Sequence, residues 1–215
     1  MRVDKASLLL YAVTDRMWLH PEESLKDRVE EAIKGGATFI QLREKDIPFD
    51  DFVALAKEVK EVTHKYHVPF VINDDVEVAL ACHADGVHVG QSDMGVCEAR
   101  KRIGEDKILG VSVQTLEQAL LAQKNGADYL GVGAVFTTTT KSDADTVSLE
   151  TLREICQAVS IPVVAIGGIH KDNLLKLKDS GVAGIAVISA LFAQLDIFAA
   201  AEELLNLTRR MVAYE

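Results

Sequence analysis

The sequence predicts an α/β protein, a single (β/α)8 (TIM) barrel formed by residues 1–215. Short apolar runs alternate with amphipathic segments about eight times. Such runs are typical of strands buried on both faces of a parallel sheet. Similar phrases also recur where a helix should lead into a strand, at 35–39, 83–87, 125–129 and 180–184. Eight units of this length favour a closed barrel, and an open doubly wound sheet is the alternative.

The strands are expected where apolar residues run together without polar interruption. The first of these runs ends at Asp15, and the sixth begins at Tyr129. In order, the expected strands are 8–14, 39–43, 69–73, 86–89, 108–112, 129–132, 162–166 and 184–188. No linker or domain boundary interrupts the series.

The helices are expected where apolar residues recur at intervals of three and four. The first should stop at Gly35-Gly36 and the fifth at Asn125-Gly126, because glycine is common at helix C-termini. Pro48 suits the first turn of the second. In order, the expected helices are 25–33, 48–62, 76–81, 94–103, 116–124, 149–159, 173–178 and 198–211, with a short extra one after residue 188.

Composition limits the classes of partner. The formal charge of −10 and pI near 5.1 argue against nucleic acid or an anionic membrane. Three widely spaced cysteines fit free thiols in a reducing cytoplasm, and no apolar run reaches spanning length. A metal site at Cys82, His83 and His88 lacks the paired-cysteine spacing that would support it.

Active sites of such barrels lie at the C-terminal ends of the strands. After the second strand, Gln41, Arg43 and Lys45 should share one direction and Leu42 and Glu44 the other. We expect the first set to point into the barrel mouth, where two cations would attract an anion. An ion pair with a neighbouring carboxylate is the alternative.

Acidic residues follow the third and fourth strands. Asp74 and Asp93 could approach each other there, and carboxylates suit a hard cation such as Mg²⁺ bridging to phosphates. Helix capping is the alternative for each, and it is the preferred interpretation for Asp75. Ser112, which ends the fifth strand, could bind a ligand or cap the next helix.

Two further segments suggest phosphate binding. The sixth strand passes through Gly131 and Gly133 into threonines 137–140 and Lys141, which can donate to phosphate oxygens. An ordinary solvated loop is the alternative. Backbone amides at Gly167-Gly168, and those that open a short helix after Ile188, would form a phosphate site below strands seven and eight. The group of Arg43, Lys45, Asp74 and Asp93 predicts a second, metal-bound phosphate across the mouth. Two separate phosphate sites suggest two phosphorylated ligands.

The sequence resembles the thiamine-phosphate synthase family over nearly its whole length. The motifs are Tyr11-Ala-Val-Thr-Asp15, Gln41-Leu-Arg-Glu-Lys45, Ile72-Asn-Asp74, Gly86-Val-His-Val-Gly-Gln-Ser-Asp93, Gly110-Val-Ser112, the stretch from Gly131 to Lys141, Val164-Ala-Ile-Gly-Gly168 and Ala186-Val-Ile-Ser-Ala190. The resemblance implies an enzyme that joins a hydroxymethylpyrimidine diphosphate to a thiazole phosphate and releases pyrophosphate.

The resemblance also implies residue roles. The pyrimidine diphosphate would be bound by Gln41, Leu42, Arg43, Glu44, Lys45, Asn73, Ser112 and Lys141. The thiazole phosphate would be bound by Thr138, Thr139, Thr140, Gly168, Ile188 and Ser189. Asp74 and Asp93 would hold Mg²⁺, the implied cofactor. Arg43, Lys45, Lys141 and Ser112 would be the catalytic residues, because the implied dissociative mechanism needs charge stabilisation rather than a nucleophile.

Three positions depart from the family pattern. Asp75 stands where a basic residue is common, and Ala134 and Thr137 stand where proline is common. A related thiazole tautomerase would need no diphosphate site, and a non-catalytic barrel that senses thiamine precursors would show no turnover. Within the fourth strand, His88 could face the barrel interior, whereas His64 and His67 should lie on the surface.

Overall fold

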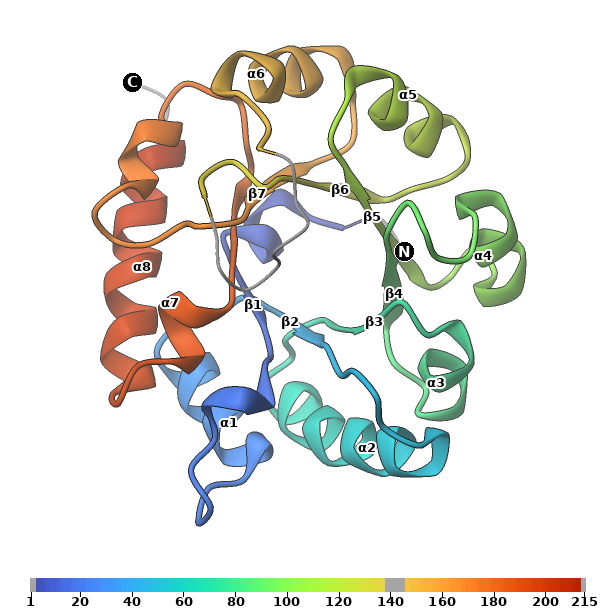
Figure 1. Ribbon diagram of the computed structural model, residues 1–215, viewed down its shortest axis with the longest axis vertical. Helices are drawn as coiled ribbons and strands as arrows, with labels where there is room; N and C mark the ends of the chain where they lie inside the picture. Colours follow the sequence, from blue (N-terminus) through green and yellow to red (C-terminus); the bar gives the residue numbers. More distant parts are fainter. Residues whose placement is uncertain (1–2, 138–145, 214–215) are drawn as a thin grey trace.

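The protein folds as a closed barrel of eight parallel strands surrounded by helices, as predicted (Figure 1). The computed structural model describes residues 3–137 and 146–213. Each strand pairs with its neighbours in chain order, and β8 closes the ring against β1. The strands are β1 (Leu10–Val13), β2 (Phe39–Leu42), β3 (Phe70–Asn73), β4 (Gly86–Val89), β5 (Ile108–Val113), β6 (Tyr129–Val132), β7 (Val163–Ile166) and β8 (Gly184–Val187).

The α-helices that cover the barrel are α1 (Leu25–Lys34), α2 (Phe49–Lys65), α3 (Val76–Ala81), α4 (Val96–Ile103), α5 (Leu116–Lys124), α6 (Leu149–Ala158), α7 (Ser189–Phe192) and α8 (Ile197–Val212). Side-chain caps fix where several of them begin. The oxygens of Ser24, Thr115, Ser148 and Asp196 accept bonds from backbone N–H groups in the first turns of α1, α5, α6 and α8. Such caps satisfy donors that the helix leaves unpaired.

Two expected elements differ in the kind of local structure that part of them adopts, and the other differences are shifts of one to three residues in the bounds. β1 starts at Leu10 rather than residue 8, because Lys5–Leu8 forms the 3-10 helix η1, capped by Asp4. The segment expected as a helix at 173–178 is the 3-10 helix η3, Leu174–Leu177. The backbone leaves helical geometry at Lys178, where ψ is 141°, so this segment ends after one turn.

The core has two layers separated by the strands. Outward-facing strand residues pack against the helices, and inward-facing residues fill the barrel. The interior cluster comprises Leu8, Tyr11, Val13, Phe39, Val71, Ile108, Tyr129, Val164, Ala183 and Ala186. The barrel is therefore a packed core, and a ligand can enter only at its ends.

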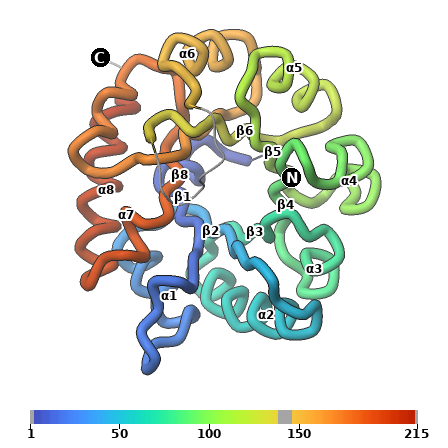
Figure 2. The backbone as a smooth tube through the Cα atoms, in the orientation of Figure 1, coloured from blue at the N-terminus to red at the C-terminus, as the bar shows by residue number. Residues whose placement is uncertain are grey.

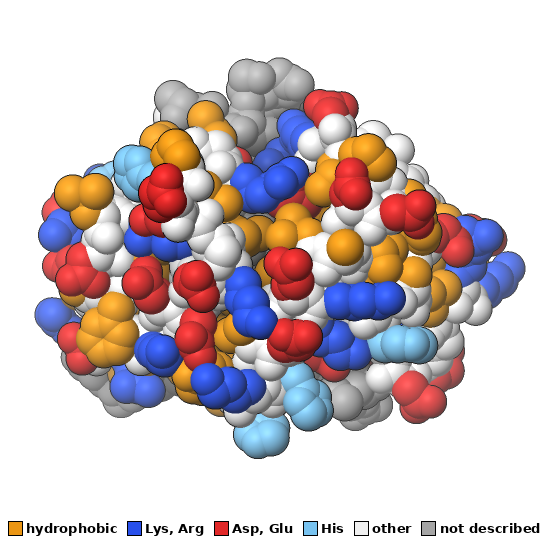
Figure 3. Space-filling model, turned by 90° about the horizontal axis from the view of Figure 1, so that it is seen from below, with side chains coloured by type: hydrophobic (Ala, Val, Ile, Leu, Met, Phe, Trp, Pro, Cys, Tyr) orange, Lys and Arg blue, Asp and Glu red, His pale blue; other side chains and the backbone are white. Residues whose placement is uncertain are grey.

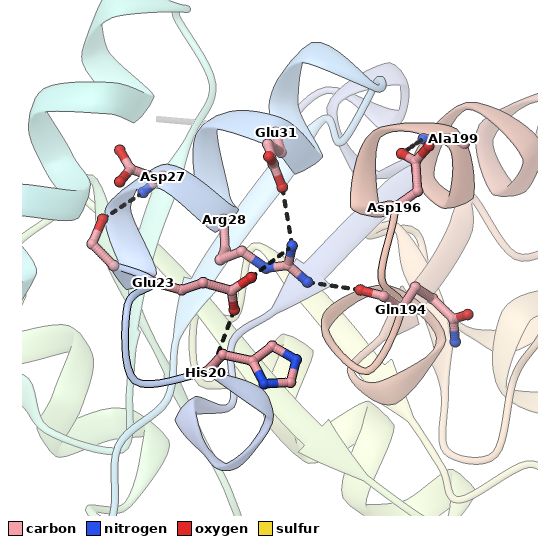
Figure 4. Close-up of polar contacts among 9 residues, drawn as sticks. His20, Glu23, Asp27, Arg28, Glu31, Gln194, Asp196 and Ala199 are labelled. Carbon is pink, nitrogen blue, oxygen red and sulfur yellow. Dashed lines mark hydrogen bonds and ion pairs between the residues drawn. The ribbon is translucent and has the colours of Figure 1, made fainter.

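The ring closes where β1 and β8 lie side by side (Figure 2). A buried arginine connects the first βα unit with the last one. Arg28 on α1 donates to the backbone carbonyl of Gln194, between α7 and α8, at 2.7 Å. Glu31 and Glu23 pair with the same guanidinium at 3.3 and 3.5 Å (Figure 4). Truncating one partner of a buried charge network is costly, so Arg28 contributes to closing the ring.

Charged side chains of both signs lie on the surface of the protein. Acidic and basic side chains are interspersed on the face seen in Figure 3 and do not gather into a large patch of one sign. Within residues 3–137 and 146–213, no helix has the length and apolar character needed to span a bilayer.

Candidate active site

Two cavities open at the C-terminal ends of the strands. One, of about 370 Å³, lies beyond β1 and β2 and is lined by Asp15, Arg16, Met17, Arg43, Glu44 and Lys45. The other, of about 410 Å³, lies beyond β7 and β8 and is lined by Phe136, Thr137, Gly168, His170, Asn173, Ser189, Ala190, Ala193 and Gln194. Both include residues that the sequence predicts to bind phosphorylated ligands.

The end of β2 holds the predicted cation pair. Gln41 points into the barrel, as predicted, and its amide donates to the Tyr11 hydroxyl at 2.5 Å. Beyond the strand, the backbone N–H of Arg43 donates to the buried Thr14 hydroxyl at 3.0 Å. Thr14 thereby extends the pairing of the first two strands and fixes where the Arg43 side chain starts. Lys45 is exposed at the rim of the same cavity.

The expected alternation of side chains stops where β2 stops. Arg43, Glu44 and Lys45 line one cavity, so Glu44 does not face away from the two cations as strand geometry predicted. The chain turns there, since β2 ends at Leu42 and Asp46 has a positive φ of 54°. Leu42 itself is fully buried against the helix layer.

Glu44 is a buried carboxylate with one unused oxygen. Its Oε2 accepts from Arg16 Nε at 2.7 Å, and the carboxylate side chain is only 4% exposed. Its Oε1 is the single buried side-chain polar atom without a hydrogen-bond partner among the described residues. Burial raises the pKa of Glu44, and the neighbouring Arg16 opposes that rise. The sequence alone did not predict a role for Arg16, which follows β1 and lines the same cavity.

Asp74 and Asp75, in the loop after β3, have different surroundings. The Asp74 backbone N–H donates to the His88 carbonyl at 2.7 Å, and its side chain is exposed. Asp75 accepts from the backbone N–H of Val78 at 2.9 Å and is the N-cap of α3, as expected. The Asp75 carboxylate is thus held at the N-terminus of α3. Asn73, the last residue of β3, is partly buried beside His88 in the strand register.

Asp93 belongs to the turn after β4. Its Oδ2 accepts from the Gly90 backbone N–H at 2.7 Å, and α4 is capped by Gly95, so Asp93 does not cap that helix. A carboxylate can accept several bonds, which leaves Asp93 able to bind a cation as well. The described residues contain no group of three or more His, Cys, Asp or Glu side chains with metal-site geometry. Two carboxylates on adjacent strand ends fit Mg²⁺, which commonly takes one or two and completes its shell with water and phosphate.

Ser112 does not cap α5, since Thr115 has that role. Its hydroxyl instead bonds His88 Nε2 at 2.8 Å, and the opposite ring nitrogen of His88 bonds the Tyr129 hydroxyl at 2.9 Å. His88 faces the barrel interior, as its position in the strand suggested. The sequence alone does not connect His88 with Tyr11 or Tyr129. Strand parity was the available signal, because all of these residues face inward.

The exit from β6 is held against the end of β7. Val135 and Phe136 donate their backbone N–H groups to the carbonyls of Ile166 and Gly167 at 3.0 and 3.1 Å. The carbonyl of Ala134 accepts from Val147 at 2.7 Å. These bonds join the two ends of the threonine segment to the barrel. Thr138, Thr139, Thr140 and Lys141 lie outside the described residues.

The ends of β7 and β8 form the second cavity. Gly168 has a φ of 64°, and an added Cβ would lie 2.4 Å from the Thr137 carbonyl, so only glycine fits. Asn173 donates to the Gly168 carbonyl at 2.8 Å and accepts from His170 at 2.9 Å, which fixes this loop. Ser189 lines the same cavity and opens α7, for which Ile188 is the capping residue.

In a closed eight-stranded barrel, strands four places apart lie opposite each other. β3 and β4, which carry Asp74 and Asp93, therefore lie across the mouth from β7 and β8, which carry Gly168 and Ser189. The cations after β2 lie on the acidic side. The arrangement can bind one anion, together with a cation, near the acids. A second anion can bind at the glycine loop on the opposite side.

Most of the chain is similar to known proteins. A family model described as thiamine monophosphate synthase matches residues 10–191. A thiamine-phosphate synthase from Clostridium tetani is 54% identical over 195 residues, which are 91% of this chain and 93% of that protein. The enzyme of the same name from Ruminiclostridium cellulolyticum is 54% identical over 203 residues, 94% of this chain and 96% of that one.

A solved structure agrees. A thiamine phosphate pyrophosphorylase from Pyrococcus furiosus superposes with a TM-score of 0.89 at 44% identity, covering 97% of this chain and 99% of that one. Sequence likeness and fold likeness therefore each extend over more than nine tenths of the chain. The chain belongs to the thiamine monophosphate synthase family and is a transferase of thiamine biosynthesis.

Proposed function

We propose that this chain joins 4-amino-2-methyl-5-hydroxymethylpyrimidine diphosphate to 4-methyl-5-(2-phosphoethyl)thiazole, releasing pyrophosphate and thiamine phosphate, at the mouth described above. The observation that carries the residue assignment is the division of the mouth. Cations and two acids occupy one side, and a glycine loop with a cavity occupies the other. Two phosphorylated substrates require two such places.

The diphosphate belongs on the side of β2 to β4. Arg43 and Lys45 line one cavity there, and Lys141 would approach from the β6 segment. Gln41, Asn73 and Ser112 lie at or next to the C-terminal residues of β2, β3 and β5, where they can contact the pyrimidine ring. Asp75 is held as the cap of α3, so its charge is turned to the helix and does not oppose the diphosphate directly.

Asp74 and Asp93 would hold Mg²⁺ on the diphosphate. When bound, the ion would neutralise charge that builds up on the leaving pyrophosphate. Asp93 is kept in place for this by its bond from Gly90. Carboxylate oxygens in this number match the preference of Mg²⁺ for hard donors and retained water.

The thiazole phosphate belongs in the cavity of β7 and β8. Backbone N–H groups at Gly168 and at the start of α7, with the Ser189 hydroxyl, would donate to its phosphate oxygens. Thr138, Thr139 and Thr140 would add hydroxyl donors from the β6 segment. The Asn173 bonds keep the Gly168 loop in the shape that this requires.

The proposed reaction is dissociative. The C–O bond between the pyrimidine methyl carbon and the diphosphate breaks, and its electron pair leaves with pyrophosphate. The lone pair of the thiazole nitrogen then forms the new C–N bond. Arg43, Lys45 and Lys141 stabilise the leaving group, and the two binding sites hold the reacting atoms together. No protein nucleophile is needed.

The test is pyrophosphate release measured with both substrates, with each alone, and with a chelator. Release that needs both substrates and is abolished by the chelator is the expected result. Absence of release by an enzyme that still binds the thiazole phosphate would overturn the proposal and favour a tautomerase or a sensor.

A cytoplasmic location stays a prediction, supported by the three free cysteines.

A further inference from the structure

Five side chains form a continuous chain of hydrogen bonds across the barrel interior. The Gln41 amide lies 2.5 Å from the Tyr11 oxygen, which lies 2.7 Å from the Tyr129 oxygen. Tyr129 lies 2.9 Å from His88 Nδ1, and His88 Nε2 lies 2.8 Å from the Ser112 oxygen. The chain therefore connects Gln41 on β2 with Ser112 on β5, and both of these residues belong to the proposed pyrimidine site.

Counting hydrogens gives the chain a direction. Tyr11 accepts from Gln41, so its one hydrogen goes to Tyr129. Tyr129 then donates to His88 Nδ1, which must carry a lone pair, and the hydrogen of His88 lies on Nε2. His88 therefore donates to Ser112, whose own hydrogen remains available for a ligand. Reversing one link would leave a buried donor or acceptor unpaired, which is costly.

The surrounding interior is shaped for these bonds. An added Cβ on Gly110 would lie 2.3 Å from the Tyr129 oxygen and 2.5 Å from His88 Nδ1, so a side chain there would disrupt their contact. The Phe39 ring packs against both tyrosines, with centroids 4.6 and 5.6 Å away. Burial raises the pKa of both Tyr11 and Tyr129, so both phenols keep the hydrogens that the chain needs.

We propose that Tyr11, Tyr129 and His88 are positioning residues that fix the hydrogen-bonding roles of Gln41 and Ser112 toward the aminopyrimidine ring. The Gln41 carbonyl is left to accept, and the Ser112 hydroxyl is left to donate. The inference deepens the proposed function and rests on it, because the ring must lie between these two groups.

These roles suit the chemistry of the ring. An aminopyrimidine presents an N–H donor beside a ring nitrogen acceptor, so it needs one acceptor and one donor from the protein. As the C–O bond breaks, the exocyclic amino group supplies electron density to the methyl carbon and becomes more positive. An acceptor held on that amino group binds the transition state more tightly than the substrate, which raises kcat.

The decisive variant is Tyr129→Phe, which removes the central oxygen and keeps the ring. We expect kcat to fall about tenfold, the size typical of one lost hydrogen bond, while KM for the thiazole phosphate stays within about twofold. Phe39→Leu is the matched control, since it alters the same packing and removes no polar atom. A loss of kcat in Phe39→Leu equal to that in Tyr129→Phe would overturn the proposal.

A double variant separates positioning from general damage. If Tyr129 acts through Ser112, Tyr129→Phe should cost little further kcat in a Ser112→Ala enzyme. An equal loss in both backgrounds would overturn the proposal. Wild-type enzyme that releases no pyrophosphate would refute the proposed function instead, so the two failures are distinguishable.

The direction of the chain has a test that needs no turnover. Nitrogen-15 NMR of histidine-labelled wild-type protein, with His88 assigned from a His88→Gln variant, should show hydrogen on Nε2 and a lone pair on Nδ1. In Tyr129→Phe the His88 signals should shift, because Nδ1 loses its donor. Hydrogen on Nδ1 in the wild-type protein would overturn the assigned direction.

Discussion

Two buried polar clusters in this barrel have similar burial and different positions. One is centred on Arg100, which donates to the backbone carbonyls of Gly104, Lys107 and Gly126 and pairs with Asp128 at 2.6 Å. The other is the series of hydrogen-bonded side chains that connects Gln41 with Ser112 through Tyr11, Tyr129 and His88. Arg100 is 9% exposed and Gln41 is 4% exposed, so burial alone does not distinguish them.

The position along the strands distinguishes the clusters. Lys107 and Asp128 immediately precede β5 and β6, which places the Arg100 cluster at the N-terminal end of the barrel. Gln41 and Ser112 lie one residue before the C-terminal ends of β2 and β5. Residues at the N-terminal end serve stability, and those at the C-terminal end serve catalysis. A buried polar network is thus interpreted by the end of the barrel that it occupies.

The largest expected effect is at the mouth. Asp93→Asn keeps an oxygen for the Gly90 N–H and removes the charge, so we expect turnover to fall about 10²- to 10³-fold with the fold intact. Steady-state kinetics across a magnesium titration would measure this. Asp75→Asn is the control, because asparagine caps as well as aspartate. An Asp93→Asn enzyme as active as Asp75→Asn would refute the magnesium assignment.

At the opposite end, stability should change and catalysis should not. Arg100→Met leaves Asp128 without its cationic partner and three carbonyls without the guanidinium donor, so the free energy of unfolding should fall by about 3–5 kcal/mol. Urea denaturation measures the loss, and kcat of the folded variant should match wild type. Arg102→Met removes an exposed pair with Glu77 and should cost at most about 1 kcal/mol. A loss of kcat in Arg100→Met would contradict the contrast between the two ends.

Asn173 should show a smaller effect on one substrate only. Asn173→Ala removes both bonds that hold the Gly168 loop, so KM for the thiazole phosphate should rise about tenfold. KM for the pyrimidine diphosphate should stay unchanged in the same kinetic series. An equal rise in both KM values would indicate a general disturbance of the mouth.

The smallest expected effect concerns Glu44. Because burial raises its pKa in the folded protein, Glu44 favours folding below its ordinary pKa of 4.5, and this contribution is lost as pH rises through the raised pKa. Glu44→Gln cannot titrate, so its stability relative to wild type should improve as pH rises across that window. Urea denaturation at several pH values would detect this. A pH-independent difference would contradict the raised pKa.

Much of the fold could be predicted from local sequence. Apolar runs and helix-end signals placed β4, α3 and α5 at the bounds that the structure has. Errors came at two places: residues 8–9 are apolar but precede β1, and the segment expected as a helix at 173–178 leaves helical geometry at Lys178 after one 3-10 turn. The predicted family membership and closed barrel are confirmed. The site roles and Mg²⁺ stay predictions.

What the sequence by itself determined is the order of strands and helices, and hence which residues follow each strand, because periodicity and capping act over a few residues. Only the tertiary structure decided which inward-facing residues meet. Tyr11 and Tyr129 are 118 residues apart, yet their hydroxyls lie 2.7 Å from each other. Barrel closure and strand register set that contact, and no local pattern encodes the distance across a barrel.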